Sequence, residues 1–274
     1  MPAVAGFAVS MIALSAAMAA GVGARLGLWH FGVGFGILRW AASLGIAGMA
    51  LSLAGAVLAR PGGGRRWFLV ACAGFVLGAV AFGVPWNRSR IAKQLPMIHD
   101  ISTDTDNPPA FVAVLPHRKD APNSAEYGGP EIAAQQRAAY PDIRPIDVGI
   151  PPRLAYQHAI DVARGMGWRI VDGNREEGRI EATATTRWFG FKDDVVIRIV
   201  ETAGQGTRLD IRSVSRVGIS DVGANACRIR IFRRKFLDLS QRAISASVRA
   251  PAPAAGGPDA AHSPDRKRQH PEPA

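Results

Sequence analysis

Three apolar runs without a charged side chain fill most of the first 96 residues and limit this part of the chain to a membrane region. Each run is about as long as a helix needs to cross a hydrocarbon core of roughly 30 Å. The runs are Pro2–Gly23, Trp40–Ala59 and Trp67–Val84. Four of the six tryptophans lie near their predicted ends, as in an interfacial aromatic belt: Trp29, Trp40, Trp67 and Trp86. The pattern predicts transmembrane helices near 2–24, 37–59 and 67–85 within a membrane region 1–96.

The first apolar run has a second interpretation. It contains Ala-Ala-Met-Ala-Ala-Gly, which resembles the small-residue cleavage site of a secretory signal. The run lacks the basic residues that should precede such a signal. We therefore expect a retained helix.

Charge is distributed unevenly along the chain. All 22 acidic residues lie at or after Asp100, whereas the first 96 residues carry 8 of the 33 Lys and Arg. The other 25 basic residues nearly balance the acids, so the net charge of +11 does not indicate a nucleic-acid partner. Three cations flank the N-terminal side of the predicted helices and five flank the other side. By the positive-inside rule this count favours a cytoplasmic domain.

The chain after the apolar runs predicts a soluble domain over 97–248. Its first part, 97–150, is rich in loops, with a helix start at Asn107-Pro108-Pro109 and a short helix over 130–139. Residues 249–274 are dominated by Pro, Ala and Gly and predict a disordered tail.

The second part of the soluble domain has clearer periodicity. A helix over 153–166 is followed by four segments with strand-like alternation or apolar runs, joined by Gly-rich turns. A last helix, capped by Ser220, carries an apolar stripe along its length. The order predicts an α+β fold, an antiparallel four-stranded meander flanked by helices that cover one face of the sheet.

The stretch HDISTDTDNPPAF, residues 99–111, is the first candidate site. Asp104, Asp106 and Asn107 have the spacing that opens a calcium loop, but Pro109 and Leu115 stand where an EF-hand needs Gly and Glu. Two interpretations remain. The carboxylates form a different cation site, or they accept hydrogen bonds from the backbone of their own loop.

The stretch TTRWFGFKDD, residues 185–194, is the second candidate site. Its exposed aromatic residues indicate a binding or membrane-contact surface. Asp193 and Asp194 could carry out acid–base chemistry, or they could form ion pairs with Arg187 or Arg198. The ion-pair interpretation is favoured.

The third candidate site is the stretch RSVSRVGISDVGAN, residues 212–225. Arg212 and Arg216 lead into the predicted start of the last helix, where Asp221 and Asn225 lie, and guanidinium groups beside a helix start can bind an anion. The same arginines could instead pair with Asp193, Asp194 or Asp221, and this interpretation is at least as well supported. The last helix is also basic, so it either packs its stripe on the sheet or lies on anionic lipid.

Known catalytic signatures are absent from the sequence. It has no nucleophile elbow, Walker loop, dinucleotide fingerprint or H-E-x-x-H, and its two cysteines lack metal-ligand spacing. We predict no cofactor and no metal site, and no catalytic residue can be named.

The three stretches HDISTDTDNPPAF, IEATATTRWFGFKDDVVIRI and DIRSVSRVGISDVGANACRIR closely resemble the family called domain of unknown function 1499. The resemblance covers about 97–240, and the apolar leader is similar to the membrane-anchored bacterial branch. The family has no established activity, so the resemblance implies no catalytic residue. Other members look exported or lipid-anchored, which implies an extracytoplasmic domain and opposes the charge count.

We expect a multi-pass protein of the bacterial inner membrane with a periplasmic domain that binds a ligand, lipid or partner of the cell envelope. Its expected partners are the lipid bilayer and a membrane or envelope protein, with no nucleic acid. The alternative is a membrane-anchored enzyme, a hydrolase or a metal-dependent one, that uses Asp and Arg residues of the three stretches. The alternative requires their carboxylates to meet in a pocket with unpaired oxygens.

Overall fold

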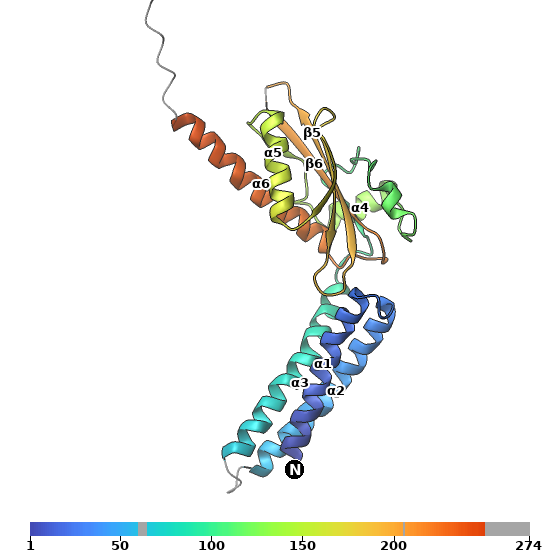
Figure 1. Ribbon diagram of the computed structural model, residues 1–274, viewed down its shortest axis with the longest axis vertical. Helices are drawn as coiled ribbons and strands as arrows, with labels where there is room; N and C mark the ends of the chain where they lie inside the picture. The colour runs from blue at the N-terminus through green and yellow to red at the C-terminus, as the bar shows by residue number, and fades with distance from the viewer. Residues whose placement is uncertain (60–64, 205, 250–274) are drawn as a thin grey trace, which may run out of the picture.

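Three long antiparallel helices form a bundle, and an α+β domain lies at one end of it (Figure 1). The computed structural model describes residues 1–59, 65–204 and 206–249. The bundle helices are α1 (Pro2–Arg25), α2 (Phe31–Ala59) and α3 (Arg65–Ala92). Within the described residues, these three helices are long and apolar enough to cross a membrane, as predicted. Helix α2 begins before the predicted start at 37, and α3 continues through Pro85, which membrane helices tolerate.

Small residues let the bundle helices approach closely. Ser10 of α1 packs directly against Gly48 of α2, and the carbonyl oxygen of Gly78 in α3 lies against Gly45 of α2. A Cβ atom on Gly45 would come within 2.8 Å of that oxygen. Close backbone contact of this kind is a main source of attraction between helices in lipid, because apolar burial contributes little there.

The domain contains one antiparallel sheet with the strand order β1–β6–β5–β4–β3, in which β2 also pairs with β6. Within the described residues the sheet has six strands rather than the predicted four. The two additional strands, β1 and β2, have three residues each and lie along the same edge of β6. The predicted fold class is confirmed. The strands are β1 (Asp100–Ser102), β2 (Ile146–Val148), β3 (Arg169–Asn174), β4 (Arg179–Thr185), β5 (Lys192–Glu201) and β6 (Thr207–Ser215).

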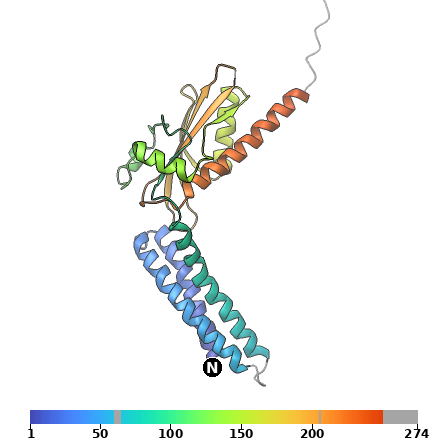
Figure 2. The ribbon, with the colours of Figure 1, turned by 180° about the vertical axis from the view of Figure 1, so that it is seen from behind.

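Two helices, α5 (Pro152–Gly165) and α6 (Ala224–Arg249), cover one face of the sheet. Phe232 and Phe236 of α6 are fully buried there, so the apolar stripe of α6 packs on the sheet. Helix α6 starts close to the bundle and then runs away from it (Figures 1 and 2). The half of α6 farthest from the bundle therefore does not lie along the surface of a membrane that the bundle would span. Residues 250–274 of the tail predicted to be disordered lie outside the described residues.

The opposite face of the sheet is covered by residues 103–128, here called the covering segment, which includes the short helix η1 (Leu115–Arg118). Phe111 and Val114 of this segment pack on Val196 and Val214 of the sheet. Helix α4 (Gly129–Ala139) follows it on the side of the sheet opposite to α5 (Figure 1). The remaining backbone of the covering segment has no helix of four or more residues, so the predicted helix start at Asn107-Pro108-Pro109 is wrong.

The predicted cap of the last helix is also wrong by one position. Helix α6 begins four residues after Ser220, because Val222 has a left-handed φ of 52° that interrupts the helix. The carboxylate of Asp221 accepts the backbone N–H of Asn225 at 2.6 Å and so caps the helix start. Burial raises the pKa of Asp221 above its ordinary value.

Candidate functional site

Charged side chains lie buried between the sheet and the covering segment. Residues that point away from α5 and α6 along the central strands include Glu181, Asp194, Asp210 and Arg212, and each is at most 2% exposed. A charge removed from water must be paired and hydrogen-bonded to be tolerated. The partners of these groups therefore determine whether any of them remains available for chemistry.

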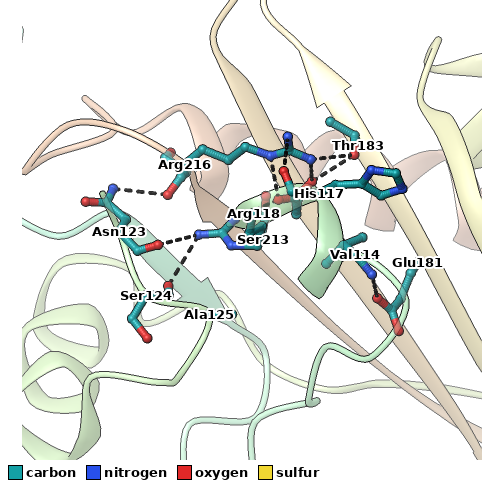
Figure 3. A network of polar contacts seen from close by, with 12 residues as sticks. Val114, His117, Arg118, Asn123, Ser124, Ala125, Glu181, Thr183, Ser213 and Arg216 are labelled. Carbon is teal, nitrogen blue, oxygen red and sulfur yellow. Dashed lines mark hydrogen bonds and ion pairs between the residues drawn. The ribbon is translucent and has the colours of Figure 1, made fainter. Parts of the chain in front are cut away.

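Asp194 is held by two arginines and one threonine, a group called here the Asp194 cluster. Its Oδ2 accepts hydrogen bonds from Arg118 Nη1 at 2.6 Å and Arg216 Nε at 2.9 Å. Its Oδ1 accepts from Arg216 Nη2 and from Thr183 Oγ1, both at 2.8 Å. Figure 3 shows Arg118 and Arg216 converging beside Thr183. Burial alone would raise the pKa of Asp194, but these hydrogen bonds outweigh it and lower the pKa below its ordinary value.

Arg212 forms a separate buried pair with Asp100. Its Nε and Nη2 donate to the two carboxylate oxygens at 2.9 and 2.6 Å. The same guanidinium donates to the backbone carbonyls of Pro109 and Ala125 and stacks over the ring of Phe111 at 5.1 Å. Arg212 therefore attaches the covering segment to the sheet, and each of its three guanidinium nitrogens donates to a protein oxygen.

Asp104 is used in the same structural way. Its Oδ1 accepts the backbone N–H groups of Asp106 and Asn107 at 3.1 and 2.9 Å. Its Oδ2 accepts from Arg198 and Arg208, each at 3.0 Å. Burial opposes ionisation, but these donors lower the pKa of Asp104 below its ordinary value. Of the two interpretations that the sequence left open, this geometry matches the one in which the carboxylate accepts hydrogen bonds from the backbone of its own loop.

Glu181 was not identified from the sequence, although it makes more backbone contacts than any predicted site residue. Its carboxylate accepts the N–H groups of Val112, Ala113 and Val114 at 2.9–3.1 Å, and it also pairs with Arg179. The contact with Val114 is visible in Figure 3. The only sequence signal was a single acid among the apolar residues of a strand, which identifies no partner.

The numbers of acidic and basic partners in these ion pairs differ between the two ends of the sheet. At the end of β4 farthest from the bundle, Arg179 is close to three acids: Asp172 at 3.1 Å, Glu177 at 2.9 Å and Glu181. At the other end, the Asp194 cluster holds two guanidinium groups on one carboxylate. The cluster nearest the bundle therefore has an excess positive charge.

The face of the sheet toward α6 carries a second polar group. Asp193 pairs with Arg228 of α6. The side-chain amide of Asn225 donates to the carbonyl of His99 at 2.9 Å, and its oxygen accepts from Ser213 Oγ at 2.7 Å. These contacts join α6 to the edge of the sheet, and each polar group has a partner.

The structure brings the three candidate stretches together only through pairs. Asp194 and Arg216 meet, whereas Asp193 and Arg212 each pair with a residue outside the predicted set. The side chain of Asp106 is 94% exposed and lies 3.5 Å from Arg137. Among the described residues, no three His, Cys, Asp or Glu side chains form a group that could hold a metal ion. Within the described part of the chain, the carboxylates of the three stretches thus do not meet in the pocket that the enzyme alternative requires.

The β4–β5 loop, Thr186–Phe191, contacts the bundle and is here called the aromatic loop. Trp188 Nε1 donates to the carbonyl oxygen of Met18 in α1 at 3.2 Å. Phe189 lies against Phe35 of α2, with ring centroids 5.1 Å apart. The carbonyl oxygens of Thr186 and Arg187 accept from the guanidinium of Arg25 at the end of α1, so Arg187 contributes its backbone. The second candidate stretch is therefore a docking element between domain and bundle.

A cavity of about 540 Å³ lies where the aromatic loop meets the bundle, and we call it the junction cavity. Its polar lining comprises His30 from the bundle and His117, Asp120, Lys192 and Arg216 from the domain. Its aromatic lining comprises Trp29, Phe31, Phe189 and Phe191. Both parts of the molecule thus form its walls, which sequence periodicity could not reveal.

A comparison with protein families gives one match. The model of the family described as "Protein of unknown function (DUF1499)" matches residues 100–236, from β1 to the middle of α6. The matched segment contains the entire sheet and the covering segment, and the three bundle helices precede it. Comparisons with the curated proteins and with the solved structures give no match.

Proposed function

Since the chain belongs to the DUF1499 family of proteins of unknown function, a function must be argued from its own site, and we propose that the junction cavity binds an amphiphile of the bilayer. We further propose that the chain is a multi-pass protein of the bacterial inner membrane with its domain on the periplasmic face. The periplasmic placement rests on the resemblance to exported and lipid-anchored proteins.

Helix contacts indicate the height of the aromatic loop relative to the bundle. Ser10 of α1 packs on Gly48 of α2. Met18 lies eight residues after Ser10, and Trp40 lies eight residues before Gly48. In antiparallel helices, equal steps from a contact reach equal heights. Trp40 and Met18 therefore lie at about one level, and Trp188 lies there too because its indole donates to Met18.

The third helix places another tryptophan at this level. Ser52 of α2 packs on Gly74 of α3. Trp40 lies twelve residues before Ser52, and Trp86 lies twelve residues after Gly74. From Trp67 to Trp86, α3 rises about 28 Å at about 1.5 Å per residue. That length is close to the hydrocarbon thickness of roughly 30 Å. One tryptophan of the domain and two of the bundle thus mark the same membrane interface.

The position of the junction cavity is the observation that carries the proposal. Ala24, one of its lining residues, lies six residues beyond Met18, which is about 9 Å farther along α1. The headgroup layer extends roughly 5–8 Å beyond the hydrocarbon core, so Ala24 lies at about its outer edge. A cavity at this depth, with aromatic rings on one side and cations on another, fits a molecule with an apolar body and a polar end.

The proposal is tested by measuring lipid retained by the full chain. Native mass spectrometry of the detergent-solubilised protein should detect one lipid that survives delipidation. Ala121→Trp would place an indole in the cavity, because Ala121 lines it, and should reduce retention. Ala138→Trp, on the exposed surface of α4, is the matched control and should retain the lipid. Equal retention by both variants, or no retained lipid in the wild-type chain, would contradict the proposal.

A further inference from the structure

We propose that the polar end of the amphiphile is the phosphate of an anionic lipid headgroup, held by Lys192 at the rim of the junction cavity. This inference rests on the proposed function and specifies the chemistry of its ligand. It is carried by the balance of charges around the cavity, by the donors that remain unpaired there and by the depth of the cavity.

Positive charge exceeds negative charge around the junction cavity. Asp120 is the single acid among its described lining residues. Arg216 also lines it and belongs to the Asp194 cluster, in which two guanidinium groups share one carboxylate. One positive charge of this buried cluster is left without a counterion, and the side chain of Arg216 is 13% exposed. An anion in the cavity would supply the missing charge at short range.

Lys192 is the donor best placed to contact such an anion directly. Its side chain is exposed, it lines the cavity, and within the described part of the chain it has no ion-pair partner. The guanidinium of Arg216 is already committed to Asp194 and to the carbonyl oxygen of His117, so it acts mainly through its charge. The ammonium group of a lysine is a point charge with three donors, which suits phosphate oxygens.

A second donor lines the cavity from the bundle. Nδ1 of His30 accepts the backbone N–H of Gly32 at 3.2 Å. In the neutral imidazole the proton must then be on Nε2, which can donate to an oxyanion. His30 and Lys192 belong to the bundle and the domain respectively, so a bound phosphate would join the two parts.

A lipid is a better source of this phosphate than a soluble metabolite. Phe31, Phe189 and Phe191 line the cavity beside the cations, and a free phosphate would make no use of these rings. The cavity wall at Ala24 also lies at about the outer edge of the headgroup layer, next to the lipid headgroups. Anionic lipids attract cations close to the surface by about 1 kcal/mol per Lys or Arg.

The test is a lipid titration of the delipidated full chain in detergent, read by native mass spectrometry. Dioleoylphosphatidylglycerol and dioleoylglycerol share their acyl chains, but only the first carries a phosphate. Lys192→Gln should weaken binding of the phosphatidylglycerol about five-fold and leave dioleoylglycerol unchanged. Lys192→Arg, which keeps the charge, and Lys235→Gln, on the exposed side of α6, should bind as the wild type does.

The possible outcomes separate this inference from the proposed function. If dioleoylglycerol binds as tightly as phosphatidylglycerol, or if Lys192→Gln has no effect, the phosphate assignment is overturned while amphiphile binding stands. If neither lipid binds the wild-type chain, both proposals fail. If millimolar inorganic phosphate displaces the phosphatidylglycerol completely, the site takes free phosphate and the assignment to a lipid is overturned.

Discussion

Replacing Asp194 by asparagine tests whether the buried ion pairs hold the domain together. The substitution keeps the size of the side chain but removes the charge that faces Arg118 and Arg216. Asp194 is fully buried, and the side chain of Arg118 is 4% exposed, so solvent cannot replace the lost charge. The variant leaves the buried guanidinium of Arg118 and the largely buried guanidinium of Arg216 with no carboxylate between them.

The magnitude follows from burial. Removing one partner of a buried ion pair costs about 3–5 kcal/mol, whereas an exposed pair contributes about 0–1 kcal/mol. Asp142 and Arg230 provide a control with matched geometry, because Arg230 donates to both carboxylate oxygens of Asp142 at 2.6 Å. Their side chains are 48% and 45% exposed. We therefore expect Asp194→Asn to cost at least about 3 kcal/mol and Asp142→Asn at most about 1 kcal/mol.

The assay is thermal unfolding of the full chain in detergent, followed by the near-ultraviolet circular dichroism of buried Trp168, which stacks on Phe232. At about 2–4 °C per kcal/mol, Asp194→Asn should lower the melting temperature by roughly 6–20 °C. In an Arg118→Met background the same change should cost less, because one of the two repelling guanidinium groups is gone. A cost of Asp194→Asn no larger than that of Asp142→Asn would refute the reasoning.

Three further predictions concern pH, packing and topology. Because folding lowers the pKa of Asp194, its ionised carboxylate stabilises the folded state at pH values above the unfolded pKa of about 3.9. This stabilisation is lost as the pH falls through the folded pKa. The difference in unfolding free energy between wild type and Asp194→Asn should therefore be constant from about pH 7 to 5 and shrink below about pH 4. Gly45→Ala should destabilise the bundle in an SDS titration, because its Cβ would meet the carbonyl of the facing helix, whereas Gly83→Ala, with open space around it, should not. A membrane-impermeant maleimide should label exposed Cys227 in intact spheroplasts of a Cys72→Ser variant if the domain is periplasmic, and labelling only after lysis would place it in the cytoplasm.

The sequence predicted the elements whose signal is local. Apolar length identified the three bundle helices, and alternation identified the long strands, since both patterns arise within one segment. The strands β1 and β2 were missed because three residues cannot display a period of two, and their strand geometry comes from pairing with β6. The helix start expected at Asn107-Pro108-Pro109 failed for a related reason. Asp104 and Glu181 accept the backbone N–H groups of this region, and the second contact joins residues 67–69 positions apart.

Partners of the charged residues could be predicted only where the register of the strands was simple. The pairing of Arg216 with an acid of the second stretch was anticipated, but Arg198 was also expected to pair with Asp193 or Asp194. Arg198 lies four residues after Asp194 on β5, about 13 Å along the strand, so it reaches Asp104 and Asp210 instead. The other expected partner, Arg187, lies in the aromatic loop, where its carbonyl oxygen accepts a hydrogen bond from Arg25 of the bundle.

The buried ion pairs and the junction cavity are parts of one arrangement. Arg216 binds Asp194 through Nε and Nη2 and donates through Nη1 to the carbonyl oxygen of His117 at 2.8 Å. That carbonyl belongs to the covering segment, of which His117, Asp120 and Ala121 line the cavity. The opposite wall is the aromatic loop, which leads directly into β5 and Asp194. Asp194 is thus linked through Arg216 to one wall and through β5 to the other, so we expect substitutions of Asp194 to alter the junction cavity as well as the stability of the sheet.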